Sequence, residues 1–296
     1  MILLKNLILI QNFLSLIKEE KKLILSVSRR TDIPAFYSEW FFNRIQEEYV
    51  LVRNPFNYKQ ISKININPEV VDCIVFWSKN PENMLNKLDK LDKYNYYFQF
   101  TLNPYNQSLE KKLPKTKQII NTFRKLSNKI GKRKIIWRYD PIILTDKIDI
   151  NYHYENFRYL ARELHKYTEK CIISFLDLYQ KTKRNLKNIN LISITKNDMR
   201  EIAKIFKNIC NKYNLKLETC AENIDLSSLG ISHGKCIDDS LISSITGKQL
   251  NISQDSNQRK ECRCISSIDI GAYNTCHHNC LYCYANHSNK AVKSNY

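Results

Sequence analysis

The chain begins its first unit of predicted structure with Leu23-Ile24-Leu25-Ser26-Val27-Ser28. This short, mostly apolar run is followed by a helix-like segment over residues 35–48. Strands that are apolar at nearly every position and alternate with helices are typical of parallel sheets, because helices bury both faces of such sheets. Residues 23–48 therefore predict a first βα unit.

The same alternation continues to the end of the 296-residue chain. Seven further strands are expected, at residues 49–53, 70–77, 96–102, 134–139, 171–176, 216–220 and 266–270. Helices are expected at residues 82–91, 116–130, 154–167 and 196–213, and a lysine-rich loop at 180–190. Eight strands in this rhythm predict a TIM-like parallel (β/α) barrel. A doubly wound open sheet is the alternative, since the number of strands does not decide whether a sheet closes.

Polar residues follow most of the predicted strands. They are Arg29-Arg30-Thr31-Asp32, Arg53-Asn54, Ser78-Lys79-Asn80, Asn103, Arg138-Tyr139-Asp140, Asp177 and Glu222. Parallel barrels carry their catalytic groups at the carboxyl ends of the strands. We therefore expect a shared polar mouth, lined in addition by Trp77 and Tyr139.

Three cysteines near the C-terminus, Cys276, Cys280 and Cys283, are spaced C-x3-C-x2-C. Three thiolates on one short loop suit a soft metal centre, and an iron-sulfur cube held by only three cysteines leaves one iron open. A structural zinc site and unligated thiols are the alternatives. His277 and His278 are adjacent, so we expect them to be solvated loop residues and not to converge on one ion.

This spacing, with Tyr282 directly before the last cysteine, resembles the signature of the radical S-adenosylmethionine (SAM) enzymes. In that superfamily the open iron of a 4Fe-4S cluster binds SAM, and the cluster delivers one electron that cleaves it. The resulting carbon radical removes a hydrogen from the substrate. The resemblance therefore implies a radical-SAM-type enzyme with a 4Fe-4S cluster and SAM as cofactors, an electron donor such as flavodoxin or ferredoxin, and Tyr282 near the cofactor.

Residues 24–36, 76–81 and 269–286 together resemble a bacterial domain-of-unknown-function family, whose C-terminal cysteine cluster is likened to the iron-binding motif of biotin synthase. Ordinary radical-SAM barrels carry the cysteines after the first strand, whereas here they follow the last. The resemblance therefore implies a circularly permuted barrel, with the cysteine loop (262–284) next to the first strand. The superfamily's glycine-rich SAM contact has no counterpart, so we expect Arg29 and Arg30 to meet the SAM carboxylate and Asp32 its amine or ribose.

The other cysteines fall into two groups. Cys220, Cys236, Cys262 and Cys264 are enough to close a second metal site. An auxiliary iron-sulfur cluster, a zinc ion and four free thiols all remain open for this set. Cys73, Cys171 and Cys210 lie within predicted strands or helices and are expected in the core.

The net charge of +18 would ordinarily indicate a polyanionic partner such as nucleic acid. The lysines are scattered through every segment, however, which is typical of a solvated surface. A nucleic-acid-binding or repair protein is therefore an alternative, and a loose likeness to the radical-SAM spore photoproduct lyases also favours it. A non-catalytic zinc-binding protein is a second alternative.

Ten cysteines without a signal peptide indicate a reducing cytoplasm and not a disulfide framework. The apolar start of the chain is interrupted by polar residues and is shorter than the roughly 20 residues that a bilayer span needs. We expect residues 1–22 to be an N-terminal extension without a membrane anchor, and residues 23–296 to form a single α/β domain.

Overall fold

The computed structural model describes residues 22–295, and its main feature is one eight-stranded parallel sheet. The strand order is β11-β10-β8-β6-β5-β4-β1-β12. The strands are β1 (Leu23–Val27), β4 (Val71–Ser78), β5 (Tyr96–Thr101), β6 (Ile135–Ile142), β8 (Lys170–Phe175), β10 (Lys216–Thr219), β11 (Ser232–His233) and β12 (Ile268–Asp269). From β1 to β11 the order follows the sequence, and β12 returns to pair with β1 through Leu25–Ile268 and Ser26–Asp269.

The expected TIM-like barrel is wrong, because the sheet does not close. Its edge strands, β11 and β12, do not pair with each other. The protein is instead a mixed α/β fold with an open parallel sheet, a Rossmann-like or flavodoxin-like layout. The expected circularly permuted barrel is therefore also wrong. The structure retains one feature of it, since the first and last strands of the sheet, β1 and β12, are neighbours.

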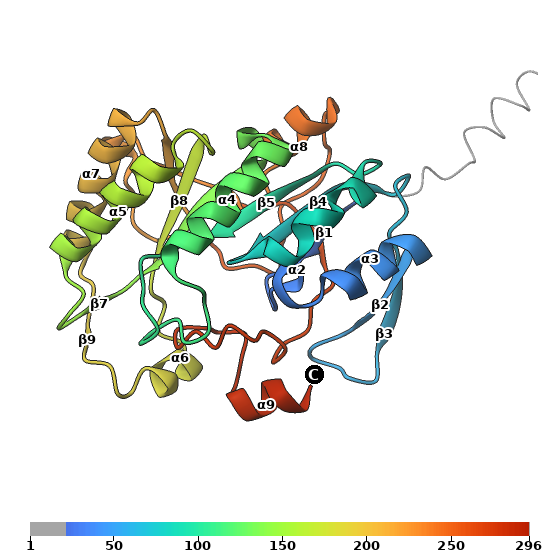
Figure 1. The fold of residues 1–296 in the computed structure, drawn as a ribbon, viewed down its shortest axis with the longest axis horizontal. Coiled ribbons are helices and arrows are strands. Elements are labelled where there is room, and N and C mark those ends of the chain that lie inside the picture. The colour runs from blue at the N-terminus through green and yellow to red at the C-terminus, as the bar shows by residue number, and fades with distance from the viewer. Residues whose placement is uncertain (1–21, 296) are drawn as a thin grey trace, which may run out of the picture.

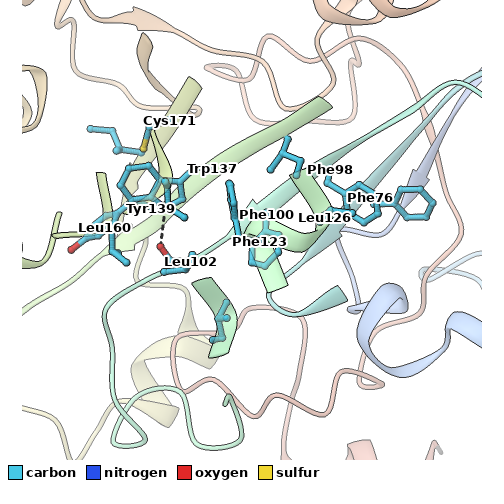
Figure 2. Packing of buried hydrophobic residues seen from close by; sticks show 14 of the residues in the cluster. Phe76, Phe98, Phe100, Leu102, Phe123, Leu126, Trp137, Tyr139, Leu160 and Cys171 are labelled. Carbon is cyan, nitrogen blue, oxygen red and sulfur yellow. Dashed lines mark hydrogen bonds between the residues drawn. The ribbon is translucent and has the colours of Figure 1, made fainter. Parts of the chain in front are cut away.

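Helices cover one face of the sheet (Figure 1). They are α2 (Ile33–Phe36), α3 (Ser38–Glu47), the 3-10 helix η1 (Pro81–Leu91), α4 (Thr116–Ile130), α5 (Ile150–Leu164) and α7 (Lys196–Lys212). Trp137 of β6 stacks on Phe157 of α5, which stacks in turn on Phe206 of α7 with ring centroids 3.7 Å apart. Figure 2 shows part of this core, where the Trp137 indole N–H donates to the carbonyl of Leu102 at 3.0 Å.

Residues 236–265 cover the opposite face, and they include helix α8 (Asp239–Thr246). The alternate strand residues pack there, among them Ile24, Val75, Tyr97, Ile136 and Ile172, against Ile237, Ile242 and Ile265. The inside of a closed barrel is filled by side chains of its own strands. A segment with its own helix does not fit there, so it keeps the two edges of the sheet apart. This is the physical reason why the sheet is open.

Seven of the eight expected strands belong to the large sheet. The exception is residues 49–53, since β2 (Tyr49–Arg53) pairs antiparallel with β3 (Ile61–Asn65) in a separate hairpin. The expected loop at 180–190 contains a short helix, α6 (Gln180–Asn185). The remaining elements are β7 (Leu144–Thr145), β9 (Leu191–Ile192), η2 (Lys132–Lys134), η3 (Ser227–Leu229) and α9 (Asn289–Ser294).

The expected N-terminal extension lies, apart from Lys22, outside the described residues. Across residues 22–295, no helix combines the length and the apolar character needed to cross a membrane. Cys73, Cys171 and Cys210 are fully buried in β4, β8 and α7, which confirms that they are core residues.

The stacked core gives a stability prediction. Phe157 is fully buried between Trp137 and Phe206, so Phe157→Ala leaves a cavity in the middle of the stack. Buried Phe→Ala substitutions cost about 3–5 kcal/mol. We expect a loss of that size in the free energy of unfolding, measured by urea titration with circular dichroism.

Phe56→Ala is the matched control, because Phe56 is 92% exposed in the turn between β2 and β3. It removes the same atoms, and its effect should stay within about 0.5 kcal/mol. Equal losses in the two variants would contradict the packing of α5 and α7 on β6.

Candidate functional site

The carboxylate of Asp269 attaches the C-terminal cysteine loop to the first strand. Its oxygens accept hydrogen bonds from the hydroxyls of Ser26 and Ser28, both at 2.7 Å, and from the backbone N–H of Arg29 at 2.8 Å. A buried carboxylate needs such donors, because desolvating an unpaired charge is costly. Asp269 ends strand β12, so these bonds fix the point at which the loop leaves the sheet.

The loop then passes close to β1 and turns sharply. A Cβ atom on Gly271 would lie 2.0 Å from Ser28 Oγ, so only glycine allows this approach. Asn274 and Asn279 adopt left-handed backbone, with φ of 59° and 55°. Asparagine tolerates this conformation better than most residues. These three residues fold the cysteine motif back across the edge of the sheet.

His278 holds the middle of the loop against helix α2. Its Nε2 atom lies 2.7 Å from Oδ2 of Asp32, which also accepts from the backbone N–H of Lys79 at 2.8 Å. The other carboxylate oxygen of Asp32 caps α2 through the N–H of Ala35 at 3.0 Å. His278 is 4% exposed and lies against the ring of Phe36. The expectation that His278 is solvated is therefore wrong, because its partner is distant in sequence.

A buried ion pair lies beside Cys280. Lys79 Nζ is 2.8 Å from Glu110 Oε1, and the hydroxyl of Tyr282 donates to the same carboxylate oxygen. Burial disfavours the Lys79 ammonium, but Glu110, Cys280 and Asp140 together more than offset this, so the pKa of Lys79 lies above its ordinary value. The backbones of Glu110 and Cys280 also form an isolated antiparallel β-bridge. Sequence reasoning missed Glu110, which follows no strand directly and lies in no recognised motif.

These groups line one cavity of ≈ 470 Å³ at the carboxyl edge of the sheet. Both cysteine groups contribute to it, namely Cys220, Cys236, Cys262, Cys264, Cys276, Cys280 and Cys283. The four residues expected at the cofactor also line it, namely Arg29, Arg30, Asp32 and Tyr282. The structure thus brings every candidate site residue to the wall of the same space.

Some of the expected lining residues lie elsewhere. Arg53 ends β2 and Asn54 follows it in the separate hairpin, away from the parallel sheet. Tyr139 is fully buried in the helix-covered core, where its hydroxyl lies 2.7 Å from Nδ1 of His153. Successive strand residues point to opposite faces. Arg138 and Asp140 therefore reach the cavity while Tyr139 between them does not.

The three thiols of the C-x3-C-x2-C motif are uncharged without a metal. Desolvation raises the pKa of Cys276 to about 12 and also raises the pKa values of Cys280 and Cys283. Within the described part of the chain, no three His, Cys, Asp or Glu side chains already stand in metal-holding geometry. Ligation therefore requires the thiols to turn and to lose their protons. As a donor set, three soft sulfurs on one loop beside a cavity fit an iron-sulfur cluster.

The second group of cysteines is also brought together. The sulfurs of Cys220 and Cys236 are 3.1 Å apart, and Arg138 Nη1 donates to Cys236 Sγ at 2.8 Å. Cys264 Sγ accepts from the backbone N–H groups of Cys236 at 3.2 Å and Ile237 at 3.4 Å. Cys262 and Cys264 line the same wall of the cavity. Three segments of sequence, at Cys220, Cys236 and 262–264, therefore meet at one cluster of thiols.

The three residues expected to contact SAM differ in the protein groups that they already bind. The Arg29 guanidinium lies 3.8 Å from the carboxylates of Asp255 and Asp269, and both oxygens of Asp32 accept hydrogen bonds. Arg30 donates to the carbonyl of Gly271 at 3.3 Å but forms no ion pair with any residue in 22–295. Among these three, Arg30 is the one whose charge is left for a ligand.

Comparison with known proteins identifies the family of this chain. No curated protein matches the chain. A solved structure of a candidate alpha-L-fucosidase from Bacteroides thetaiotaomicron is 12% identical and covers 78% of this chain and 93% of its own, but its TM-score of 0.27 supports no argument. The family model described as Domain of unknown function (DUF1848) matches residues 24–285, which include the whole sheet except Leu23 and all the cysteines discussed above. The chain therefore belongs to the DUF1848 family.

Proposed function

We propose that this protein is a radical-SAM-type iron-sulfur enzyme in which Cys276, Cys280 and Cys283 hold a 4Fe-4S cluster. The observation that carries the proposal is that these three thiols line the same cavity as the unpaired guanidinium of Arg30. When bound, such a cluster supplies the electron that cleaves SAM, drawn from a donor such as flavodoxin or ferredoxin. The chain must hold the cysteine loop, bind SAM and shield the reaction from water.

The loop is held at its start, middle and end. Asp269 fixes its start on β1, and the carbonyl of His278 accepts from the N–H of Lys112 at 3.2 Å. The Asn286 side-chain amide donates to the carbonyl of Cys276 at 2.7 Å, which closes the loop on itself. Because these hydrogen bonds already order the backbone of the loop, less ordering entropy opposes cluster binding.

Arg30 is the residue that we assign to the SAM carboxylate. Guanidinium and carboxylate form strong bidentate hydrogen bonds, and Arg30 offers the charge that its neighbour Arg29 has already paired. We assign Asp32 a different role from the expected contact with the amine or ribose of SAM. Its carboxylate positions His278 and α2, so it acts on the cofactor only through the loop.

The charges in the cavity favour a small substrate over a polyanion. Apart from Arg30, the basic residues of its lining are paired with carboxylates, Arg29 with Asp269, Lys79 with Glu110, Arg138 with Asp140 and Arg259 with Asp177. Paired charges attract phosphates weakly, whereas nucleic-acid sites present unpaired Lys and Arg. We therefore favour a neutral or zwitterionic small molecule as the substrate over a nucleic acid.

Removing a ligand should remove the cluster. We expect the anaerobically reconstituted wild-type chain to hold about four irons and four sulfides, and SAM to change the electron paramagnetic resonance signal of the reduced protein. Cys280→Ala should lose both the iron and the SAM response. Cys210→Ala, which removes a buried thiol from helix α7, is the control and should keep both.

The ligand assignment is wrong if single Ala variants of Cys276, Cys280 and Cys283 all keep full iron and sulfide. Zinc in place of iron at these three positions would instead favour the non-catalytic zinc protein. Steeply salt-dependent binding of DNA would revive the nucleic-acid alternative.

Arg30→Gln should weaken SAM binding without removing the cluster. A hydrogen bond to a charged group contributes about 1.5–3 kcal/mol, which predicts a roughly 10- to 100-fold higher Kd. Titration of the SAM-dependent signal measures it. Arg158→Gln is the control, since Arg158 pairs with Glu155 on the exposed side of α5. An unchanged Kd for Arg30→Gln would remove Arg30 from the SAM site.

A further inference from the structure

The second group of cysteines occupies a more compact arrangement than an iron-sulfur cluster requires. We infer that Cys220, Cys236, Cys262 and Cys264 bind one zinc ion as a closed tetrathiolate site. The inference is independent of the proposed function, because it uses no residue of the loop 276–283 and no property of SAM.

The short distance between the sulfurs of Cys220 and Cys236 favours a single ion. Four thiolates at about 2.3 Å from one tetrahedral zinc lie roughly 3.8 Å from one another. The ligands of a 4Fe-4S cube each bind a different iron, so their sulfurs stand much farther apart. Here Cys220 Sγ is 3.1 Å from Cys236 Sγ, the backbone N–H of Cys236 donates to Cys264 Sγ at 3.2 Å, and Cys262 lies two residues before Cys264 on the same cavity wall. Among residues 22–295 no three such side chains yet stand in metal-holding geometry, so zinc binding requires these thiols to turn towards one centre.

The surroundings of the four sulfurs supply the donors that thiolates need. Four thiolates around one zinc carry a net charge of two negatives, and Arg138 directs a guanidinium N–H at Cys236 Sγ from a position only 5% exposed. Two backbone N–H groups, of Cys236 and Ile237, point at Cys264 Sγ. Hydrogen bonds of this kind stabilise the ionised form and tune metal sites from outside the ligand shell. The same guanidinium also pairs with Asp140, which holds it in place beside the sulfur.

The positions of the ligands in the fold suit a structural ion. Cys220 follows β10, Cys236 follows β11, and Cys262 and Cys264 belong to the segment that covers the open face of the sheet. Zinc at this point ties that covering segment to the sheet. A site with four protein ligands leaves no position for a substrate and contributes directly to folding stability.

The test uses metal analysis of the full-length chain, purified anaerobically under reducing conditions and supplied with zinc and iron. We expect about one zinc per chain, with X-ray absorption showing four sulfurs at about 2.3 Å. Cys264→Ser should lose the zinc and melt at a lower temperature, while Cys73→Ser, at a buried cysteine outside both groups, should keep it. Cys280→Ala should also keep the zinc, which separates this site from the proposed cluster.

The zinc site can be tested even if a variant fails to fold, because zinc stoichiometry and X-ray absorption are measured on the wild-type chain. A wild-type chain that holds no zinc overturns the inference, as does zinc that Cys264→Ser retains in full. Iron and sulfide at about twice the content of one cluster would assign the second group to iron instead. A Cys220–Cys236 disulfide, found by peptide mapping after free thiols are blocked, would also overturn it.

Discussion

The buried carboxylate of Asp269 is the contact on which the position of the cysteine loop depends. Strand β12 is two residues long and pairs with β1 at only two positions, which is too little ladder to fix a loop. The donors from Ser26, Ser28 and Arg29 replace the missing ladder with hydrogen bonds to a charged group. Such bonds contribute about 1.5–3 kcal/mol each, more than neutral ones. One anion therefore joins the end of the chain to its first strand.

The open sheet and the cavity have a common origin. Residues 236–265 occupy the face that a barrel would close over, and Cys236, Cys262 and Cys264 lie in that segment. The cavity is bounded by this segment, by the carboxyl ends of the strands and by the loop after β12. A closed barrel would have brought the edges together and left the covering segment outside. The departure from the expected fold is thus also what places two groups of cysteines around one space.

Local patterns predicted the local parts of this structure. Apolar runs alternating with helices predicted seven strands of the sheet, and the spacing of Cys276, Cys280 and Cys283 marked the loop, because both signals lie within a few residues. Closure of the sheet depends on contacts between distant segments, which such patterns do not contain. The pairing of His278 with Asp32 spans 246 positions, and Glu110 meets Tyr282 across 172. Glu110 and His278 were missed or misjudged for this long-range reason, whereas Tyr139 was misjudged although the alternation of strand residues places it on the opposite face from Arg138 and Asp140.

The two groups of cysteines differ in how their charge is balanced, and this difference matches the different sites that we propose. Around the second group, Arg138 contacts a sulfur directly although it also pairs with Asp140, and two backbone N–H groups point at Cys264, so the protein itself supplies donors to the thiolates. Around the C-terminal group, Lys79 is already paired with Glu110 and His278 already lies against Asp32. Thiolates there must be balanced mainly by whatever they bind. A closed ion held by such ligands stabilises the fold. Three thiolates beside Arg30, which pairs with no carboxylate of residues 22–295, instead favour a centre that still has a position to offer to a small molecule.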